Sequence, residues 1–129
     1  MTIRVLSQWA PAPKTAPNCF LCDGPSEEFQ TALSNDKVNA GRPYYKCVPC
    51  NNFLVFNDTR GNDPNNPPCK CGYSTKRQLA GPEAQIPWGV YYVCRLGTCS
   101  CYMPYIKSDG RQLLLDEVSA WYWIKQGAI

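Results

Sequence analysis

The arrangement of the cysteines constrains this chain more than any other feature. Eight of the nine cysteines fall into two sets, and each set is built from two closely spaced pairs. The pairs are Cys19-x₂-Cys22 and Cys47-x₂-Cys50 in the first set, and Cys69-x-Cys71 and Cys94-x₄-Cys99 in the second. Two cysteines a short step apart can hold one edge of a tetrahedron, the arrangement in which Zn²⁺ binds sulfur. Because the chain has no histidine, each set predicts a Cys₄ site, and the chain two Zn²⁺ ions.

Disulfides are the alternative use of so many cysteines, and they are typical of small secreted proteins. The first residues, MTIRVLSQWAPAPK, lack the apolar run and cleavage site of a signal peptide. No stretch approaches the roughly 20 apolar residues of a membrane span. Nine cysteines also cannot all pair within one chain. We therefore expect metal sites in a reducing, intracellular compartment, with the nucleus favoured over the cytoplasm.

Length and composition favour small modules that need the metal to fold. The chain has 129 residues with 12 prolines and 9 glycines, which argues against one large apolar core. Units of about 40 residues usually need a metal, disulfides or a partner for stability. Each Zn²⁺ held by four thiolates adds −2, so the formal charge of +3 becomes +3 − 4 = −1. Net charge therefore does not indicate a nucleic-acid partner, although local patches can.

The two cysteine sets belong to an internal repeat. Corresponding cysteines are offset by 50, 49, 47 and 49 positions, and YYKC at 44–47 matches YYVC at 91–94. Aromatic residues follow the last cysteine of each set, and residues of these types favour strands. The sequence thus predicts a small, mainly-β, metal-stabilised fold with two zinc-ribbon-like antiparallel sheets and a C-terminal helix. The expected segments are an arm and Pro-rich linker at 1–18, the first module at 19–60, a linker at 61–68, the second module at 69–107 and a packing helix at 108–129.

The two ends carry apolar patterns that we expect to pack on the modules. Residues 3–9 form a short apolar arm, expected to add a strand or to lie across a module. The last segment, 108–129, has an N-cap candidate at Ser108 or Asp109 and a possible C′ residue at Gly127. Leu114, Val118 and Trp121 would share a helical face, with Leu115 and Tyr122 beside it. This face would close one module or the gap between the two.

The ninth cysteine leaves one ligand open. Cys99 and Cys101 both come from the same turn, and either could complete the second site. Alignment with Cys50 favours Cys99 and leaves Cys101 as a small buried apolar residue. Catalytic zinc usually keeps a position for water and uses histidine or carboxylate ligands. Four cysteines per site indicate structural zinc, and we expect no enzyme.

The first module resembles the GRF-type zinc finger, a zinc-ribbon-like family. The resemblance is carried by a cysteine pair, then GR-x-Y-Y-x-C, then a further cysteine and aromatics; its residues are Gly41, Arg42, Tyr44, Tyr45, Cys47, Cys50, Phe53 and Phe56. Residues 69–107 resemble a degenerate second copy, which has the Cys-x-Cys-Gly opening that the first copy lacks. The resemblance implies a three-stranded, claw-shaped sheet around one zinc. It also implies binding of single-stranded nucleic acid, often alongside DNA-processing enzymes.

Cations and aromatic rings in both copies are candidates for contacts with a single strand, which is held by charge on the phosphates and stacking under the bases. The candidate contact residues are Arg42, Tyr44, Lys46, Phe53, Lys70, Lys76, Arg77, Trp88 and Arg95. About half of the strand aromatics should instead pack inward, because successive residues of a strand face opposite sides. The alternative function is a protein-interaction module with structural zinc, in which the aromatics near the C-terminus, at 121–123, anchor a partner or a dimer.

Overall fold

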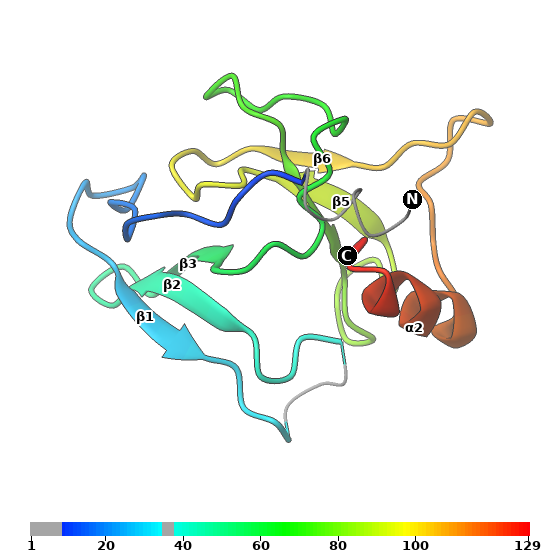
Figure 1. The fold of residues 1–129 in the computed structure, drawn as a ribbon, viewed down its shortest axis with the longest axis horizontal. Coiled ribbons are helices and arrows are strands. Elements are labelled where there is room, and N and C mark those ends of the chain that lie inside the picture. The colour runs from blue at the N-terminus through cyan, green and yellow to red at the C-terminus, as the bar shows by residue number, and fades with distance from the viewer. Residues whose placement is uncertain (1–8, 35–37) are drawn as a thin grey trace.

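Two three-stranded antiparallel sheets follow one another along the chain, as the repeat predicts (Figure 1). The computed structural model describes residues 9–34 and 38–129. The first sheet contains β1 (Glu27–Gln30), β2 (Pro43–Cys47) and β3 (Asn52–Phe56), and the second contains β4 (Lys76–Leu79), β5 (Val90–Val93) and β6 (Tyr102–Pro104). In each sheet the middle strand is the Tyr-Tyr segment, which ends at or beside a zinc-set cysteine. The predicted fold class is confirmed.

The double tyrosines alternate between the two faces of their sheets. In β2, Tyr45 is buried against Leu54 and Val55 in a small core around Cys19 and Cys47. Its neighbour Tyr44 lies on the other face, where its ring stacks on other aromatics. Half of the aromatic pattern is therefore packing, as the period of two requires.

The larger core belongs to the second module and includes one residue from the first. Its buried members are Val38, Leu79, Val90, Leu115, Ala120 and Ile129. Val38 precedes β2 in the chain, yet it packs with residues of the second sheet and the C-terminal segment. The two modules thus share a core rather than hanging from a flexible connection.

The C-terminal helix is present, but it is shorter than predicted. Helix α2 covers Glu117–Lys125 and is capped by Asp116, whose carboxylate accepts from the Ser119 N–H, instead of by Ser108 or Asp109. Gly127 follows it with φ +74°, as expected for a C′ residue. The leucines at 113–115 are extended, because Leu113 and Leu115 exchange backbone hydrogen bonds with Val90, Tyr105 and Trp88. Backbone pairing with the sheet therefore overrides the helical pattern in this segment.

The predicted apolar face of the helix is wrong. Leu114, Val118 and Trp121 are exposed, and so is Tyr122. The helix instead buries Ala120 and packs Trp123 and Ile124 against the core of the second module. The sequence pattern failed because Leu114 does not lie in the helix, so it could not share a helical face with the others.

The stretch before the second module is irregular but tightly packed. In 61–68, Asn62 and Asn66 are buried, and the Asn66 amide donates to the carbonyls of Gly61 and Thr75. Asn62 donates to the Ala10 and Pro11 carbonyls, so the chain after Trp9 lies against this segment. The rest of the predicted arm, 3–8, lies outside the described residues. Among the residues that the structure describes, no helix is long and apolar enough to cross a membrane.

Gly61 is the position where this packing leaves no room for a side chain. Its φ is +75°, and a Cβ atom built there would collide with the backbone carbonyl of Arg77. We expect Gly61→Ala to lower the free energy of unfolding by more than about 2 kcal/mol, because steric overlap adds to the strain of a left-handed residue. Gly110→Ala is the matched control, since Gly110 has φ +83° with open space around it. Urea unfolding measures both variants, and an equal loss in the free energy of unfolding for Gly61→Ala and Gly110→Ala would contradict the expectation.

Candidate metal centres and nucleic-acid interface

The structure gathers the two predicted cysteine sets into two clusters. Within each cluster the four sulfur atoms all lie within 4.8 Å of one another. A tetrahedron with Zn–S bonds of about 2.3 Å has edges of about 3.8 Å, and the Sγ atoms of Cys22 and Cys47 are 3.6 Å apart. The members are Cys19, Cys22, Cys47 and Cys50 in one cluster, and Cys69, Cys71, Cys94 and Cys99 in the other. Both donor sets fit one Zn²⁺ each, as predicted.

The loops that carry these cysteines aim backbone N–H groups at the sulfur atoms. The N–H groups of Leu21 and Gly24 each lie 3.4 Å from the sulfur two residues earlier, in Cys19 and Cys22. The second module repeats the contact, with the Cys71 N–H at 3.3 Å from Cys69 Sγ. Such donors stabilise thiolates and orient them toward a metal.

These contacts act on the acidity of the thiols. Burial raises the pKa of Cys19, but hydrogen bonds from the backbone of Leu21 and Cys22 and from Asn52 outweigh it and lower the pKa to about 6. Cys94 behaves in the same way, since the Thr98 hydroxyl and backbone N–H groups overcome burial and lower its pKa to about 6. One thiolate in each cluster is therefore ready at neutral pH to bind a metal.

The remaining thiols oppose further ionisation without a cation. The neighbouring sulfur atoms of Cys22 and Cys47 raise the pKa of Cys50 to about 12. Burial and the nearby charge of Cys94 raise the pKa of Cys69 to about 12. Four crowded thiolates need a divalent cation to coexist, so this donor chemistry suits Zn²⁺.

The choice between the two candidate ligands is settled by geometry. Cys99 belongs to the second cluster, whereas Cys101 does not. Cys101 is half-buried rather than buried, and it lines an open hollow with Lys70 and Tyr102. The prediction that it fills a buried apolar position is therefore wrong.

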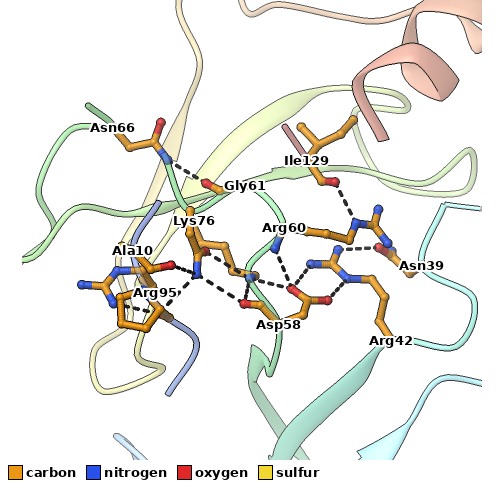
Figure 2. Close-up of polar contacts among 12 residues, drawn as sticks. Ala10, Asn39, Arg42, Asp58, Arg60, Gly61, Asn66, Lys76, Arg95 and Ile129 are labelled. Carbon is orange, nitrogen blue, oxygen red and sulfur yellow. Dashed lines mark hydrogen bonds and ion pairs between the residues drawn. The ribbon is translucent and has the colours of Figure 1, made fainter. Parts of the chain in front are cut away.

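The Gly-Arg pair of the first module has a structural role. Gly41 adopts φ +76°, a conformation that favours glycine. The Arg42 guanidinium is buried and binds Asp58 through two nitrogens at 2.8 and 2.9 Å (Figure 2). It also donates to Asn39 and lies 3.9 Å from the ring centroid of Phe56. Arg42 was predicted to contact nucleic acid, and the structure corrects this because its donors are used inside the protein.

Asp58 joins the two modules electrostatically. Lys76, from β4 of the second module, is fully buried and places its Nζ 2.8 Å from Asp58 Oδ1, opposite Arg42 (Figure 2). The ammonium group also donates to the Asp58 carbonyl and to Asn62 Oδ1. Arg60 extends the network by donating to the Val38 and Ile129 carbonyls. Lys76 cannot reach a phosphate, so its predicted role in binding is wrong.

Three other predicted contacts of the second module also serve the fold. Arg95 is buried and donates to the carbonyls of Ser74 and Pro11. Arg77 donates to the Ala128 carbonyl and to Asn66, and lies over the ring of Trp123. Trp88 packs against the larger core. Of the predicted cations in this module, Lys70 is exposed.

Three predicted contact residues meet in one groove on the first sheet. Tyr44, Lys46 and Phe53 line an open concavity of about 590 Å³. The Tyr44 ring lies 5.5 Å from Phe53 and 5.7 Å from Phe29, and Phe53 lies 4.9 Å from Phe56, all between centroids. Phe29 and Phe53 are exposed. Phe56 is buried and supports the other rings from the protein side. The concavity lined by Tyr44, Phe53 and Phe56, together with the adjoining Phe29 ring, is called the aromatic groove.

The aromatic groove has polar and cationic groups at its edges. Lys46 Nζ lies 5.7 Å from the Phe29 ring centroid. In residues 9–34 and 38–129, none of those that line the groove is acidic; the others are Gln30, Thr31, Ala32, Asn39, Asn51 and Phe56. Glu27 is the cross-strand partner of Lys46, so a carboxylate lies near the one cation among the described residues that line the groove. Sequence reasoning missed Phe29, because its strand, EEFQ, is polar and short. What identifies Phe29 is the strand register, which places it directly opposite Tyr44.

The fold and the cysteine clusters define a zinc-binding protein built on two small antiparallel sheets. The model of the GRF-like zinc ribbon domain matches residues 16–60. This segment, which contains the first sheet, the first cluster and the aromatic groove, is thus similar to a GRF-like zinc ribbon. The second cluster, between residues 69 and 99, is consistent with a second zinc site. Neither a curated protein nor a solved structure matches the chain significantly.

Proposed function

We propose that the GRF-like zinc ribbon binds single-stranded nucleic acid in the aromatic groove, and that the chain acts by binding rather than by catalysis. The observation that carries the proposal is the joined surface of Phe29, Tyr44 and Phe53, backed by the buried Phe56 and with Lys46 at its edge. Every nucleobase has a face that can stack on an aromatic ring, so such a surface accepts a strand without reading its sequence. We place DNA before RNA because the resembled family accompanies DNA-processing enzymes, and this choice favours the nucleus.

Stacking rather than charge would dominate this binding. Lys46 is the groove's cation, and Glu27 lies opposite it in the register. Each neutralised phosphate contributes a slope of about −0.7 to the dependence of log affinity on log salt for single strands. We therefore expect a slope no steeper than about −1 at this groove, in contrast to the steep dependence of highly basic proteins.

Phe53→Ala is the direct test of the groove. We expect it to weaken binding of a single-stranded oligonucleotide by about 5- to 150-fold, since stacking on one ring contributes about 1–3 kcal/mol per base. Fluorescence anisotropy with the zinc-loaded full chain, using DNA and RNA oligonucleotides of equal length, measures the loss and the preference between them.

Tyr122→Ala is the matched control, because Tyr122 is exposed on α2, outside the groove. Its affinity should equal that of the unaltered chain. Zinc content and the thermal transition of Phe53→Ala should also be unchanged. Equal affinity of Phe53→Ala and the unaltered chain, or no binding by the unaltered chain at low salt, would contradict the proposal.

A second candidate function is assembly with a protein partner or a second copy, with both zinc ions purely structural. It is favoured by the exposed side chains of Val118, Trp121 and Tyr122 on α2. Large aromatic residues supply much of the binding energy of protein interfaces. In this case Tyr122→Ala, rather than Phe53→Ala, would abolish the interaction, and the mass of the free chain would report a dimer.

A further inference from the structure

The second module retains an exposed aromatic platform at the position that Phe53 occupies in the first. Phe53 is the cross-strand partner of Lys46, which precedes Cys47, and Tyr102 is the cross-strand partner of Val93, which precedes Cys94. The two rings therefore occupy equivalent places in the repeat. Both are exposed, Phe53 at 40% and Tyr102 at 59%.

The supporting ring is also retained. Tyr102 stacks on Tyr91 with 4.9 Å between centroids, just as Phe53 lies against Tyr44 at 5.5 Å. The Tyr91 hydroxyl accepts a hydrogen bond from the buried Gln78 amide at 3.0 Å, which holds the Tyr91 ring in place beneath Tyr102. A stack held from beneath and open above is pre-organised to receive a further planar ring.

Two hollows that Tyr102 helps to line give such a ligand room. One, of about 330 Å³, is lined by Lys70, Ser100 and Met103 as well as Tyr102. The other, of about 210 Å³, is lined by Tyr91, Tyr102 and neutral residues of the loop before β5 and of the segment before α2. None of the residues that line these two hollows, all in the described part of the chain, is acidic.

The groups at this platform match the parts of a nucleotide. The Tyr102 ring can stack under a base, and Lys70 can bind the adjoining phosphate. Lys70 is exposed and donates to the Ser100 hydroxyl at 3.5 Å, so its charge remains available to an anion. The formal −2 of the neighbouring zinc site keeps the electrostatic attraction small, as at the aromatic groove.

We propose that the Tyr91–Tyr102 stack is a second base-binding site, so that one chain holds single-stranded nucleic acid at two places. This inference rests on the proposed function of the first module and extends it to the second. Other cations of the second module, Lys76, Arg77 and Arg95, are engaged inside the protein. The second site therefore offers one exposed ring, Tyr102, and one cation, Lys70.

The test is a titration of the zinc-loaded full chain with an oligothymidylate about four nucleotides long, near the lower limit of the site sizes of OB folds that bind single strands. Two-dimensional NMR should show two sets of shifting amide signals, one around Phe53 and one around Tyr102. Tyr102→Ala should weaken the second set by about 5- to 150-fold and leave the first unchanged. Tyr102→Phe should preserve both sets, and Lys70→Gln should weaken only the second.

The outcomes separate this inference from the proposed function. Signals that shift only around Phe53, with Tyr102→Ala binding like the unaltered chain, would overturn the second site and leave the first standing. Signals that shift only around Tyr102 would support the second site and remove the groove. No shift at either place would overturn both. Two zinc ions in each variant would show that the change acts on binding and not on folding.

Discussion

Replacement of Cys47 by serine is expected to unfold the first module and to reduce the zinc content from two ions per chain to one. Cys47 is 1% exposed and belongs to the same small core as Cys19, Tyr45, Leu54 and Val55. Metal binding contributes on the order of 10 kcal/mol to a structural site, which is comparable with the whole stability of a small domain. So few apolar side chains cannot hold the module without the ion.

Cys101→Ser is the matched control for this experiment. It removes a cysteine of the second module that lies outside both clusters, and we expect two zinc ions and an unchanged thermal transition. Elemental analysis and circular dichroism on the two variants give both readouts. A chain that lost one ion through Cys101→Ser, but kept two through Cys99→Ser, would show that the ligand assignment of the second site is incorrect.

The metal centres were predictable from the sequence because ligand chemistry fixes the residue type and the spacing. Cys19-x₂-Cys22 can hold an edge of a tetrahedron whatever surrounds it, and the repeat identified the weaker second set. The sheets were predictable for a similar reason, since the Tyr-Tyr segments have strand-forming residues in both copies. These features are local, and local sequence is enough to specify them.

The cations of the candidate interface could not be assigned in this way. Lys76 and Arg77 stand in the polar segment STKR, which has the composition of a solvated loop. Its last two residues begin β4 instead, and Lys76 points to Asp58, 18 positions earlier. Nothing local predicts that pairing, because it depends on how the two modules pack. The predicted start of the helix was wrong for the same reason. Leu113 and Leu115 form backbone hydrogen bonds with residues of the second module, and helix propensity cannot predict such contacts.

Replacement of Asp58 by asparagine is expected to cause the second large effect, a loss of about 3–5 kcal/mol in the free energy of unfolding. Asp58 is the carboxylate between Arg42 and Lys76, whose side chains are 4% and 0% exposed. Removal of one partner from a buried ion pair leaves the other charge desolvated and uncompensated, which costs about this much. The change would loosen the contact between the modules while both zinc sites stayed intact.

The pH dependence of stability should report the same network. Burial favours protonation of Asp58, but the hydrogen bond from Arg42 and the charges of Lys76 and Arg42 outweigh it and lower the pKa to about 2. Its contribution is therefore complete above about pH 4, the unfolded value, and is lost as the pH falls toward 2. In Asp58→Asn, the free energy of unfolding should therefore change less between about pH 4 and 2 than in the unaltered chain. Zinc release over the same range is measured separately.

Lys76 should determine how stability depends on pH on the alkaline side. Burial lowers its pKa to about 8 despite the attraction of Asp58, so the unfolded chain binds this proton more tightly, and stability should rise between pH 8 and 10.5.

A second substitution tests the same ion pair. In Asp58→Asn, the further change Lys76→Met should restore part of the lost free energy of unfolding, since an apolar side chain replaces a buried, unpaired cation. Asp63→Asn is the control: its pair with Arg77, at 3.8 Å, is partly exposed, and we expect a loss below about 1 kcal/mol. Equal losses in Asp63→Asn and Asp58→Asn, measured by urea unfolding of the zinc-loaded chain, would show that the contact between the modules does not depend on this carboxylate.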